Sequence, residues 1–377
     1  MQFQTKIKET EYHHDLKLNS MSDLINDLEF MKKLQKDSAV IEAAELLKKG
    51  EVVGLPTETV YGLAADAKNP AAVKKIFKAK GRPQDNPLIV HIAKKSQLKE
   101  LISQDISDKA EKLISQFWPG PLTIIFPKNN TVPTETSAGL DTIAVRMPAH
   151  PLMLAVIERS KLALAAPSAN TSGFPSPTRA RHVYNDLKGK IPLILDGGFC
   201  HFGVESTVID IRGDKVKVLR PGGISREEIA QFLGEEVILA AELKDKKVLS
   251  PGMKYRHYAP QKKVFIFNFS DKLSVLNQAL SKADSKKIAI ITARESEFKV
   301  EDFSNKKIEL LKVFSHKQPE ELAKNLFDLL RKLDNDESIA EIYIEELDSA
   351  GIGEAVMNRI YKAATAENYS QPGGGNN

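Results

Sequence analysis

Seven short apolar runs, rich in branched side chains, lie between residues 88 and 219 and constrain the fold more than any other feature. Gly, Pro and Asn residues separate each run from the next. Runs of five or six such residues are typical of buried strands, whereas amphipathic helices need longer periodic segments. The pattern therefore predicts a large, strand-rich α/β domain from the runs LIVHI, LTIIF, TIAVRM, LALAA, PLILD, TVIDI and KVKVL.

Two helices are predicted before these runs. The segment 38–50 has helical periodicity, with Ser38 as a candidate N-cap and Gly50 after its end. The segment 69–81 has Asn69 as a candidate N-cap, Pro70 at the first helical position and Gly81 as the stop. A short strand, 52–55, is expected between the two helices.

The chain changes character after residue 240. A capping box formed by Ser225 and Glu228 predicts the helix that closes the first domain near residue 235. Residues 241–262 lack apolar periodicity and indicate a linker. Residues 263–370 alternate three apolar runs, VFIFNF, KIAIIT and IAEIYIEEL, with helical segments at 273–283, 319–333 and 354–364. This alternation predicts a small, parallel, doubly wound domain. Residues 1–36 form an N-terminal extension whose structure the sequence leaves open, and the tail 371–377 is expected to be disordered.

Composition excludes several classes of protein. The 54 basic and 50 acidic residues give a net charge of only +4, which does not mark a nucleic-acid binder. The single cysteine, Cys200, excludes an intramolecular disulfide framework and a zinc site built on several thiolates, and it favours a reducing compartment. Because the chain also shows neither a membrane-spanning run nor a signal peptide, we expect a cytoplasmic location.

The segment PTETVYGL, residues 56–63, places hydroxyl groups and a glycine directly after a buried strand. Ligand crevices of α/β proteins open at such strand ends. An ordinary turn is the competing interpretation.

A second candidate segment, 78–92, presents cationic and amide side chains at a helix end. Lys80 and Arg82 could neutralise a triphosphate, Arg82 with bidentate hydrogen bonds, and the bend also presents Asn86. The alternative is that cations in a last helical turn complement the helix dipole and face water. That explains Lys74, Lys75 and Lys78 better than Arg82. His91 lies inside an apolar run, where a hydrogen-bonded core histidine is the competing interpretation.

A third segment, APSANTSGFPSPT at 166–178, could wrap hydroxyl and backbone donors around a phosphate or a ribose, although inert loops have similar compositions. Further glycines occur at 196–198, 203–210 and 219–225, together with Arg220. The chain has no P-loop, no dinucleotide fingerprint, no nucleophile–base pair and no metal-ligand spacing. Many hydroxyls and cations at strand ends instead suit nucleotidyl or phosphoryl transfer, which depends on positioning and charge neutralisation.

Eight ordered motifs between residues 38 and 262 resemble the threonylcarbamoyl-AMP synthase family, whose catalytic domain is YrdC-like. They are PTETVYGL, KxR followed by PxxNPLxxH, FWPGPLT, AVRMP, PSANTSG, GVEST, LRPGG and SPGMKYRHYAP. The resemblance implies a YrdC-like twisted-sheet catalytic domain at 37–240, a linker over the active site at 241–262, and the Rossmann-like C-terminal domain of long family members at 263–370.

The same resemblance implies a reaction. L-threonine and bicarbonate give N-carboxythreonine, whose carboxylate attacks the α-phosphate of ATP to form threonylcarbamoyl-AMP and pyrophosphate. Mg²⁺ is expected to accompany ATP. A separate transferase would then use the product to make threonylcarbamoyladenosine in tRNA, and the chain itself could bind tRNA weakly.

The resemblance also assigns residues by matching motif. Lys80 and Arg82 are expected to act in catalysis. The remaining assignments fall into three groups: ATP is expected at Arg82, Asn86, Thr142, Ser168, Asn170, Ser176, Arg220 and Ser250; threonine at Thr59, His91, Arg146 and Ala166; and a linker lid at Ser250, Tyr255 and His257.

Two other functions compete with this interpretation. One is a non-catalytic RNA-binding or ribosome-assembly protein, which the balanced charge and the lack of clustered aromatic residues disfavour. The other is a carbamoyl-adenylate enzyme that uses carbamoyl phosphate, which the threonine-contacting residues and the linker disfavour.

Overall fold

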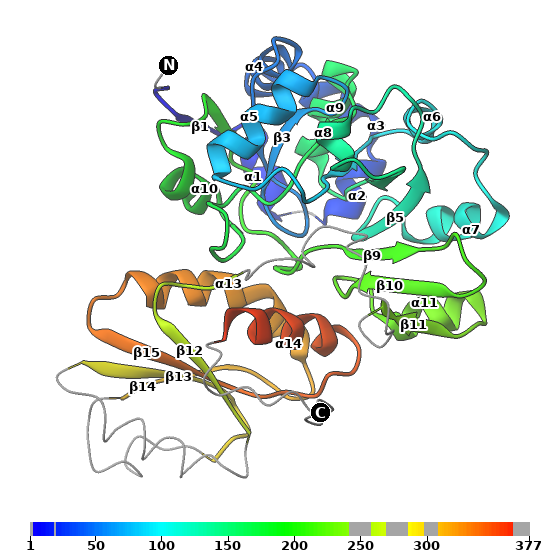
Figure 1. The fold of residues 1–377 in the computed structure, drawn as a ribbon. Helices are drawn as coiled ribbons and strands as arrows, with labels where there is room; N and C mark the ends of the chain where they lie inside the picture. The colour runs from blue at the N-terminus through cyan, green and yellow to red at the C-terminus, as the bar shows by residue number, and fades with distance from the viewer. Residues whose placement is uncertain (1–2, 19, 241–257, 269–285, 298–307, 365–377) are drawn as a thin grey trace. The chain divides into compact units, whose positions relative to one another are not determined.

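A computed structural model describes residues 3–18, 20–240, 258–268, 286–297 and 308–364 (Figure 1). The chain divides into two compact units. Residues 1–172 and 176–255 form the first, and residues 173–175 and 256–377 form the second.

The described strands of the first unit form one mixed sheet. Its order is β1-β8-β2-β3-β7-β4-β6-β5-β9-β10-β11. The seven apolar runs all contribute strands to this sheet, as the sequence predicts. The strands are β1 (Lys6–Lys8), β2 (Val53–Leu55), β3 (Gly62–Asp66), β4 (Ile89–His91), β5 (Leu122–Pro127), β6 (Thr142–Arg146), β7 (Leu164–Ala165), β8 (Leu193–Leu195), β9 (Thr207–Asp210), β10 (Val216–Arg220) and β11 (Val237–Leu239).

Both faces of this sheet are covered, which explains why the strands are apolar runs rather than alternating patterns. Val53 and Leu55 belong to one apolar core, and Leu63 and Ala65 belong to the core on the opposite face. Helices α3, α4 and α9 pack in the first core, and α5, α7, α10 and α11 in the second. The helices are α1 (His13–Leu18), α2 (Met21–Asn26), α3 (Leu28–Leu34), α4 (Ser38–Lys48), α5 (Pro70–Lys80), α6 (Lys95–Lys99), α7 (Asp108–Phe117), α8 (Thr134–Ser137), α9 (Pro151–Ser160), α10 (Ala180–Leu187) and α11 (Arg226–Leu233).

The N-terminal extension is part of the first unit. Strand β1 pairs in parallel with β8, with Lys8 opposite Leu195. Leu16, Met31 and Leu34 are buried in the same core as α4 and α9. The sequence left the structure of this segment open because its apolar residues follow no single period.

The helix caps test the sequence predictions one by one. Asn69 caps α5, Pro70 is its first residue and Gly81 ends it at φ +62°, all as predicted. The capping box of α11 is also confirmed, with Ser225 Oγ accepting from the backbone of Glu228. The prediction for Ser38 is wrong by one residue. The cap of α4 is Asp37, because its carboxylate accepts from the backbone amides of residues 39 and 40.

The second unit contains a four-stranded parallel sheet with the order β12-β15-β13-β14. The sequence predicts three of these strands and misses β14. Helices α13 and α14 pack against each other (Figure 1). The helix predicted at 273–283 lies outside the described residues, as does the tail 371–377. The elements are β12 (Lys263–Phe267), β13 (Lys287–Ala293), β14 (Ile308–Phe314), α13 (Pro319–Asn335), β15 (Ile339–Glu345) and α14 (Ile352–Ala363).

In the part of the chain that the structure describes, no helix combines the length and the apolar character needed to cross a membrane.

Candidate functional site

Two of the three candidate segments lie side by side. The amide of Leu63 donates to the carbonyl of Pro167 at 2.8 Å, and the amide of Ala169 donates to the carbonyl of Tyr61 at 2.8 Å. Gly62 also forms a bridge with Ser168. The segments 56–63 and 166–178 therefore meet, although about a hundred residues separate them in the chain.

Lys80 joins the remaining candidate segment, 78–92, to these two. It is the last residue of α5 and only 2% exposed. Its Nζ donates to the carbonyls of Ser168 and Asn170, the latter at 2.6 Å, and lies 3.4 Å from Asn170 Oδ1. Ser168 Oγ in turn donates to Asn170 Oδ1. A buried ammonium group thus fixes the part of the loop that carries Ser168 and Asn170, two of the predicted ATP ligands.

Arg146 connects the first segment to the strand ends. It is the last residue of β6 and lies opposite His91, the last residue of the parallel strand β4. Its Nη1 donates to Thr59 Oγ1 at 2.9 Å, and its Nε donates to the carbonyl of Gly120 at 3.0 Å. The structure therefore brings three of the four predicted threonine-binding residues together at one edge of the sheet.

Glu58 is a functional candidate that the sequence interpretation missed. Its Oε1 lies 2.5 Å from Arg146 Nη2, and the two side chains are 2% and 4% exposed. The contact is an ion pair without the alignment of a hydrogen bond, since neither Glu58 oxygen nor Arg146 Nη2 has a hydrogen-bond partner among the described residues. The signal in the sequence was an acidic residue between two threonines directly after a buried strand.

His91 is 3% exposed, and burial together with the neighbouring Arg146 charge lowers its pKa from 6.5 to about 3. Its imidazole is therefore neutral at physiological pH. Nδ1 has no hydrogen-bond partner among the described residues. The unpartnered Nδ1 makes His91 a candidate for a substrate contact, while the backbone of Leu164 and Ile89 also acts on the ring through hydrogen bonding.

The predicted ATP-binding residues Arg82, Asn86 and Thr142 lie toward the other end of the same strands. Arg82 Nη2 is 3.4 Å from the carbonyl of Asn86 and 3.5 Å from that of Pro87. Thr142 begins β6, and Ala144 pairs with Ile89, so the parallel register brings Thr142 level with Pro87. Asn86 is 1% exposed, and its Oδ1 has no partner among the described residues.

Ser176 and Arg220 meet through the GVEST segment. Ser176 Oγ donates to Glu205 Oε1 at 2.6 Å, and Arg220 Nη2 donates to the carbonyl of Ser206 at 2.7 Å and to its Oγ at 3.0 Å. All four side chains are buried. The glycine of this segment is visible in the sequence as a loop signal, whereas Glu205 and Ser206 carry no comparable signal and were given no role.

The remaining predicted residues divide into described and undescribed ones. Ala166 is buried, and its amide donates to the carbonyl of Ile89 at 2.9 Å, which places it beside β4. The predicted lid residues Ser250, Tyr255 and His257 lie outside the described residues, so the ATP contact assigned to Ser250 stays a prediction.

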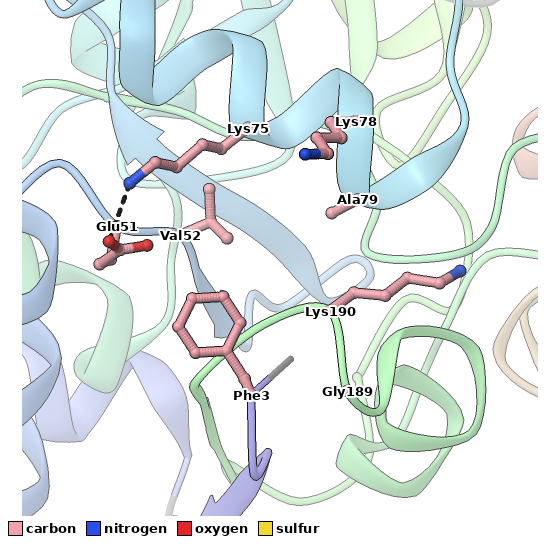
Figure 2. A pocket seen from close by; sticks show the side chains of 8 residues that line it. All are labelled: Phe3, Glu51, Val52, Lys75, Lys78, Ala79, Gly189 and Lys190. Carbon is pink, nitrogen blue, oxygen red and sulfur yellow. Dashed lines mark hydrogen bonds and ion pairs between the residues drawn. The ribbon is translucent and has the colours of Figure 1, made fainter. Parts of the chain in front are cut away.

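A cavity of about 500 Å³ lies beside the face of α5 that carries Lys75 and Lys78 (Figure 2). None of the predicted site residues lines it. Lys75 pairs there with Glu51 at 2.8 Å. The cavity is thus distinct from the converging loops. Its lining residues are Phe3, Glu51, Val52, Lys75, Lys78, Ala79, Gly189 and Lys190.

Comparison with known proteins gives consistent matches over most of the chain. A family model described as "Telomere recombination" matches residues 45–222, and one described as "Threonylcarbamoyl-AMP synthase, C-terminal domain" matches residues 224–365. The threonylcarbamoyl-AMP synthase of Pyrococcus abyssi is 45% identical over 85% of this chain and 93% of that protein. The Bacillus subtilis synthase is 45% identical over 87% and 93%. The crystal structure of P. abyssi Sua5 complexed with L-threonine matches with a TM-score of 0.77 at 43% identity, covering 86% of this chain and 94% of that one.

Proposed function

The chain belongs to the threonylcarbamoyl-AMP synthase family, and we propose that the buried polar site between its three loops is where the synthesis takes place. The chain forms threonylcarbamoyl-AMP from L-threonine, bicarbonate and ATP, and the product serves the modification of tRNA. The reaction type, the roles of individual residues, the metal ion and the downstream partner are the parts of this function that we propose here.

Buried polar atoms without partners support this location more than any other observation. Asn86 Oδ1 and His91 Nδ1 have no hydrogen-bond partner among the described residues, and both residues are at most 3% exposed. Arg146 Nη2 has the ion pair with Glu58 but no hydrogen bond among those residues. Leaving such an atom unpaired costs roughly 1–3 kcal/mol. A bound polar substrate would supply the missing partners, and the cost is then offset on binding.

We assign the threonine side of the site to the ends of β4 and β6. Arg146 is held in place by Thr59 and Gly120, and its guanidinium group would pair with the substrate carboxylate. The neutral His91 ring and the Thr59 hydroxyl would bind the polar groups of threonine. The backbone of Ala166, beside β4, would form the remaining wall. Glu58 would set the orientation of Arg146 through the ion pair.

We assign ATP to the residues that surround the 166–178 loop and the GVEST segment. Arg82 would neutralise the departing pyrophosphate. Lys80 acts mainly on the protein itself, because its ammonium group already bonds two loop carbonyls. It would hold the hydroxyl and amide groups of this loop in the geometry that the nucleotide requires. The further contacts would come from Asn86, Thr142, Ser168, Asn170, Ser176 and Arg220.

Mg²⁺ is the metal ion that ATP chemistry implies. Among the described residues, no group of three histidine, cysteine or carboxylate side chains lies beside Lys80 or Arg82. This fits an ion that is held chiefly by phosphate oxygens and water, as Mg²⁺ often is. When bound, it would neutralise charge on the phosphates.

The proposed chemistry is a nucleotidyl transfer. The carboxylate of N-carboxythreonine attacks the α-phosphorus of ATP, a new P–O bond forms, and the bond to the β-phosphate oxygen breaks so that pyrophosphate leaves. Such a step needs in-line positioning and charge neutralisation rather than a covalent enzyme intermediate. The product is a mixed anhydride, so the site must also exclude water. A separate tRNA-modifying transferase would accept the product.

Pyrophosphate release tests this proposal. The assay uses ATP and Mg²⁺, with threonine or bicarbonate omitted in turn. We expect release only when both are present, and loss of release in the R146A variant. Release that ignores both omissions would contradict the proposal. A chain that releases no pyrophosphate but binds RNA would support the non-catalytic alternative, and release that depends on carbamoyl phosphate would support the other rival.

A further inference from the structure

The pairing of β1 with β8 brings together three metal-binding side chains from distant parts of the sequence. Lys8 lies opposite Leu195, and the amide of Asp196 donates to the carbonyl of Lys8 at 2.8 Å. Glu9 follows directly on β1, and His13 begins helix α1 a few residues later. The three groups therefore come from the N-terminal extension and from the DGG turn after β8.

Their ligand atoms lie within the reach of one ion. One atom from each of Glu9, His13 and Asp196 lies within 4.8 Å of the other two. His13 Nε2 is 3.5 Å from Glu9 Oε1. Two ligands of Zn²⁺, each at about 2.0–2.2 Å, are roughly 3.4 Å apart in a tetrahedral site. The Glu9 side chain is 59% exposed and can rotate to close the remaining gap. We propose that Glu9, His13 and Asp196 form a binding site for a divalent cation of the Zn²⁺ class.

The hydrogen bond at His13 Nδ1 fixes the tautomer in which Nε2 can bind a metal ion. His13 Nδ1 is 3.2 Å from the carbonyl of Asp196, which can only accept, so Nδ1 carries the proton. In the neutral ring, Nε2 then holds the lone pair. Metal-binding histidines almost always donate their second N–H in this way. His13 is 8% exposed, and its Nε2 has no hydrogen-bond partner among the described residues.

The charges also fit a divalent ion. Two carboxylates contribute two negative charges, and one neutral imidazole supplies the nitrogen that Zn²⁺ prefers over Mg²⁺ or Ca²⁺. Asp196 Oδ1 already accepts from the amide of Gly198 at 2.8 Å and lies 3.2 Å from Tyr61 Oη. Its second oxygen is the one that would bind the ion. Water would complete the coordination on the exposed side of Glu9.

Binding there would couple the N-terminal extension to the site. Tyr61 Oη lies 2.8 Å from the carbonyl of Gly198 and 3.2 Å from Asp196 Oδ1, and Tyr61 belongs to the PTETVYGL segment. An ion at Asp196 would thus hold β1, α1 and the turn at 196–198 together and steady the tyrosine beside them. The competing interpretation is a protonated His13 that bonds the backbone carbonyl of Asp196 through Nδ1 and pairs with Glu9 through Nε2, without any metal.

Cobalt substitution and calorimetry distinguish the two interpretations. The full chain is stripped with a chelator and titrated with Zn²⁺ by calorimetry and with Co²⁺ by visible absorption. We expect one ion per chain, a rise in melting temperature, and Co²⁺ d–d bands of a site with few ligands. H13A should weaken binding by more than about 100-fold, since even loss of a group behind a ligand costs roughly 10–100-fold.

Each variant at a proposed ligand has a control variant at a neighbouring residue of the same type. H14A alters the neighbouring histidine and should leave binding unchanged. E9Q removes an exposed carboxylate that the fold does not require, so it should weaken binding even if H13A fails to fold, and E11Q should not. No binding to the wild-type chain would overturn the proposal. Binding that persists unchanged in H13A and E9Q would also overturn it, because the ion would then be held elsewhere.

Discussion

Helix α5 carries lysines in two contrasting environments. We call its buried C-terminal end, at Lys80, the inner end, and the exposed face with Lys75 and Lys78 the outer side. Lys80, at the inner end, is 2% exposed and donates to two carbonyls of the 166–178 loop. Lys75, on the outer side, has a 42% exposed side chain and pairs with Glu51, and Lys78 is exposed beside the same cavity (Figure 2). From sequence alone, these lysines form one basic cluster.

The difference shows that position on the helix, and not the density of charge, separates a site residue from a surface residue. A buried ammonium group must be hydrogen-bonded at nearly every donor, and its acceptors become rigidly placed in return. An exposed ammonium group gains little from its partner because water and salt screen the pair.

Exchanging lysine for alanine at the two positions should separate them most clearly. K80A removes the buried ammonium group and leaves two loop carbonyls without their donor. Because this loop carries Ser168 and Asn170, we expect kcat/KM for pyrophosphate release to fall by about 10²–10³-fold. K78A is the control and should stay within about twofold of the wild type. Equal losses in both variants would mean that the basic cluster acts as a whole.

Burial and exposure also separate two ion pairs, the buried pair of Glu58 with Arg146 and the exposed pair of Glu51 with Lys75. E58Q breaks the buried pair with Arg146, and we expect a loss of about 3 kcal/mol in the free energy of unfolding, measured by urea denaturation. KM for threonine should rise, while the affinity for ATP is unchanged. E51Q breaks the outer pair with Lys75 and should cost at most about 1 kcal/mol. A threonine KM that E58Q leaves unaltered would remove Glu58 from the site.

Local sequence signals were sufficient for much of the fold. Asn69, Pro70 and Gly81 each specify one end of α5 through a single physical requirement, and all three were predicted. At α4, Asp37 and Ser38 are both good caps in adjacent positions, so sequence could not decide between them. Strand β14 was missed because its side chains are mostly half-exposed and its sequence lacks clear alternation.

Contacts between distant segments were harder to predict. The motif loops were found because hydroxyls, glycines and cations gather at strand ends. The partner of Arg146 was not, because Glu58 becomes an ion-pair partner only when β6 lies beside the 56–63 segment. The Glu9, His13 and Asp196 cluster depends on the pairing of β1 with β8, which no spacing in the sequence records.

Acid should lower the free energy of unfolding through the buried histidines rather than through exposed ones. The folded-state pKa is about 3 for His91 and about 4 for His150, both lowered mainly by burial, against 6.5 in the unfolded chain. Below pH 6.5 the unfolded state therefore binds more protons. Stability is complete above that pH and is lost as the pH falls toward 4 and then 3, by up to about 1.4 kcal/mol per pH unit for each histidine.

Urea denaturation at several pH values checks this slope. H91Q should flatten it by the contribution of one histidine, whereas the same change at the exposed His201 should leave it unaltered. An identical slope in wild type and H91Q would show that His91 is not buried as a neutral ring.

The smallest effect is expected at the start of α5, where the cap stabilises the helix without reaching either lysine group. Asn69 Oδ1 accepts from the amides of Ala71 and Ala72 at 3.0 and 3.2 Å, so N69A should cost about 1 kcal/mol and a few degrees in Tm. N69D retains an acceptor and serves as the control. Turnover well below Tm should stay within about twofold, because ten residues of helix, roughly 15 Å, separate the cap from Lys80. A folded N69A variant with strongly reduced turnover would contradict this expectation. It would mean that the position of Lys80 depends on the whole helix, and that burial alone does not explain the contrast between Lys80 and the exposed lysines.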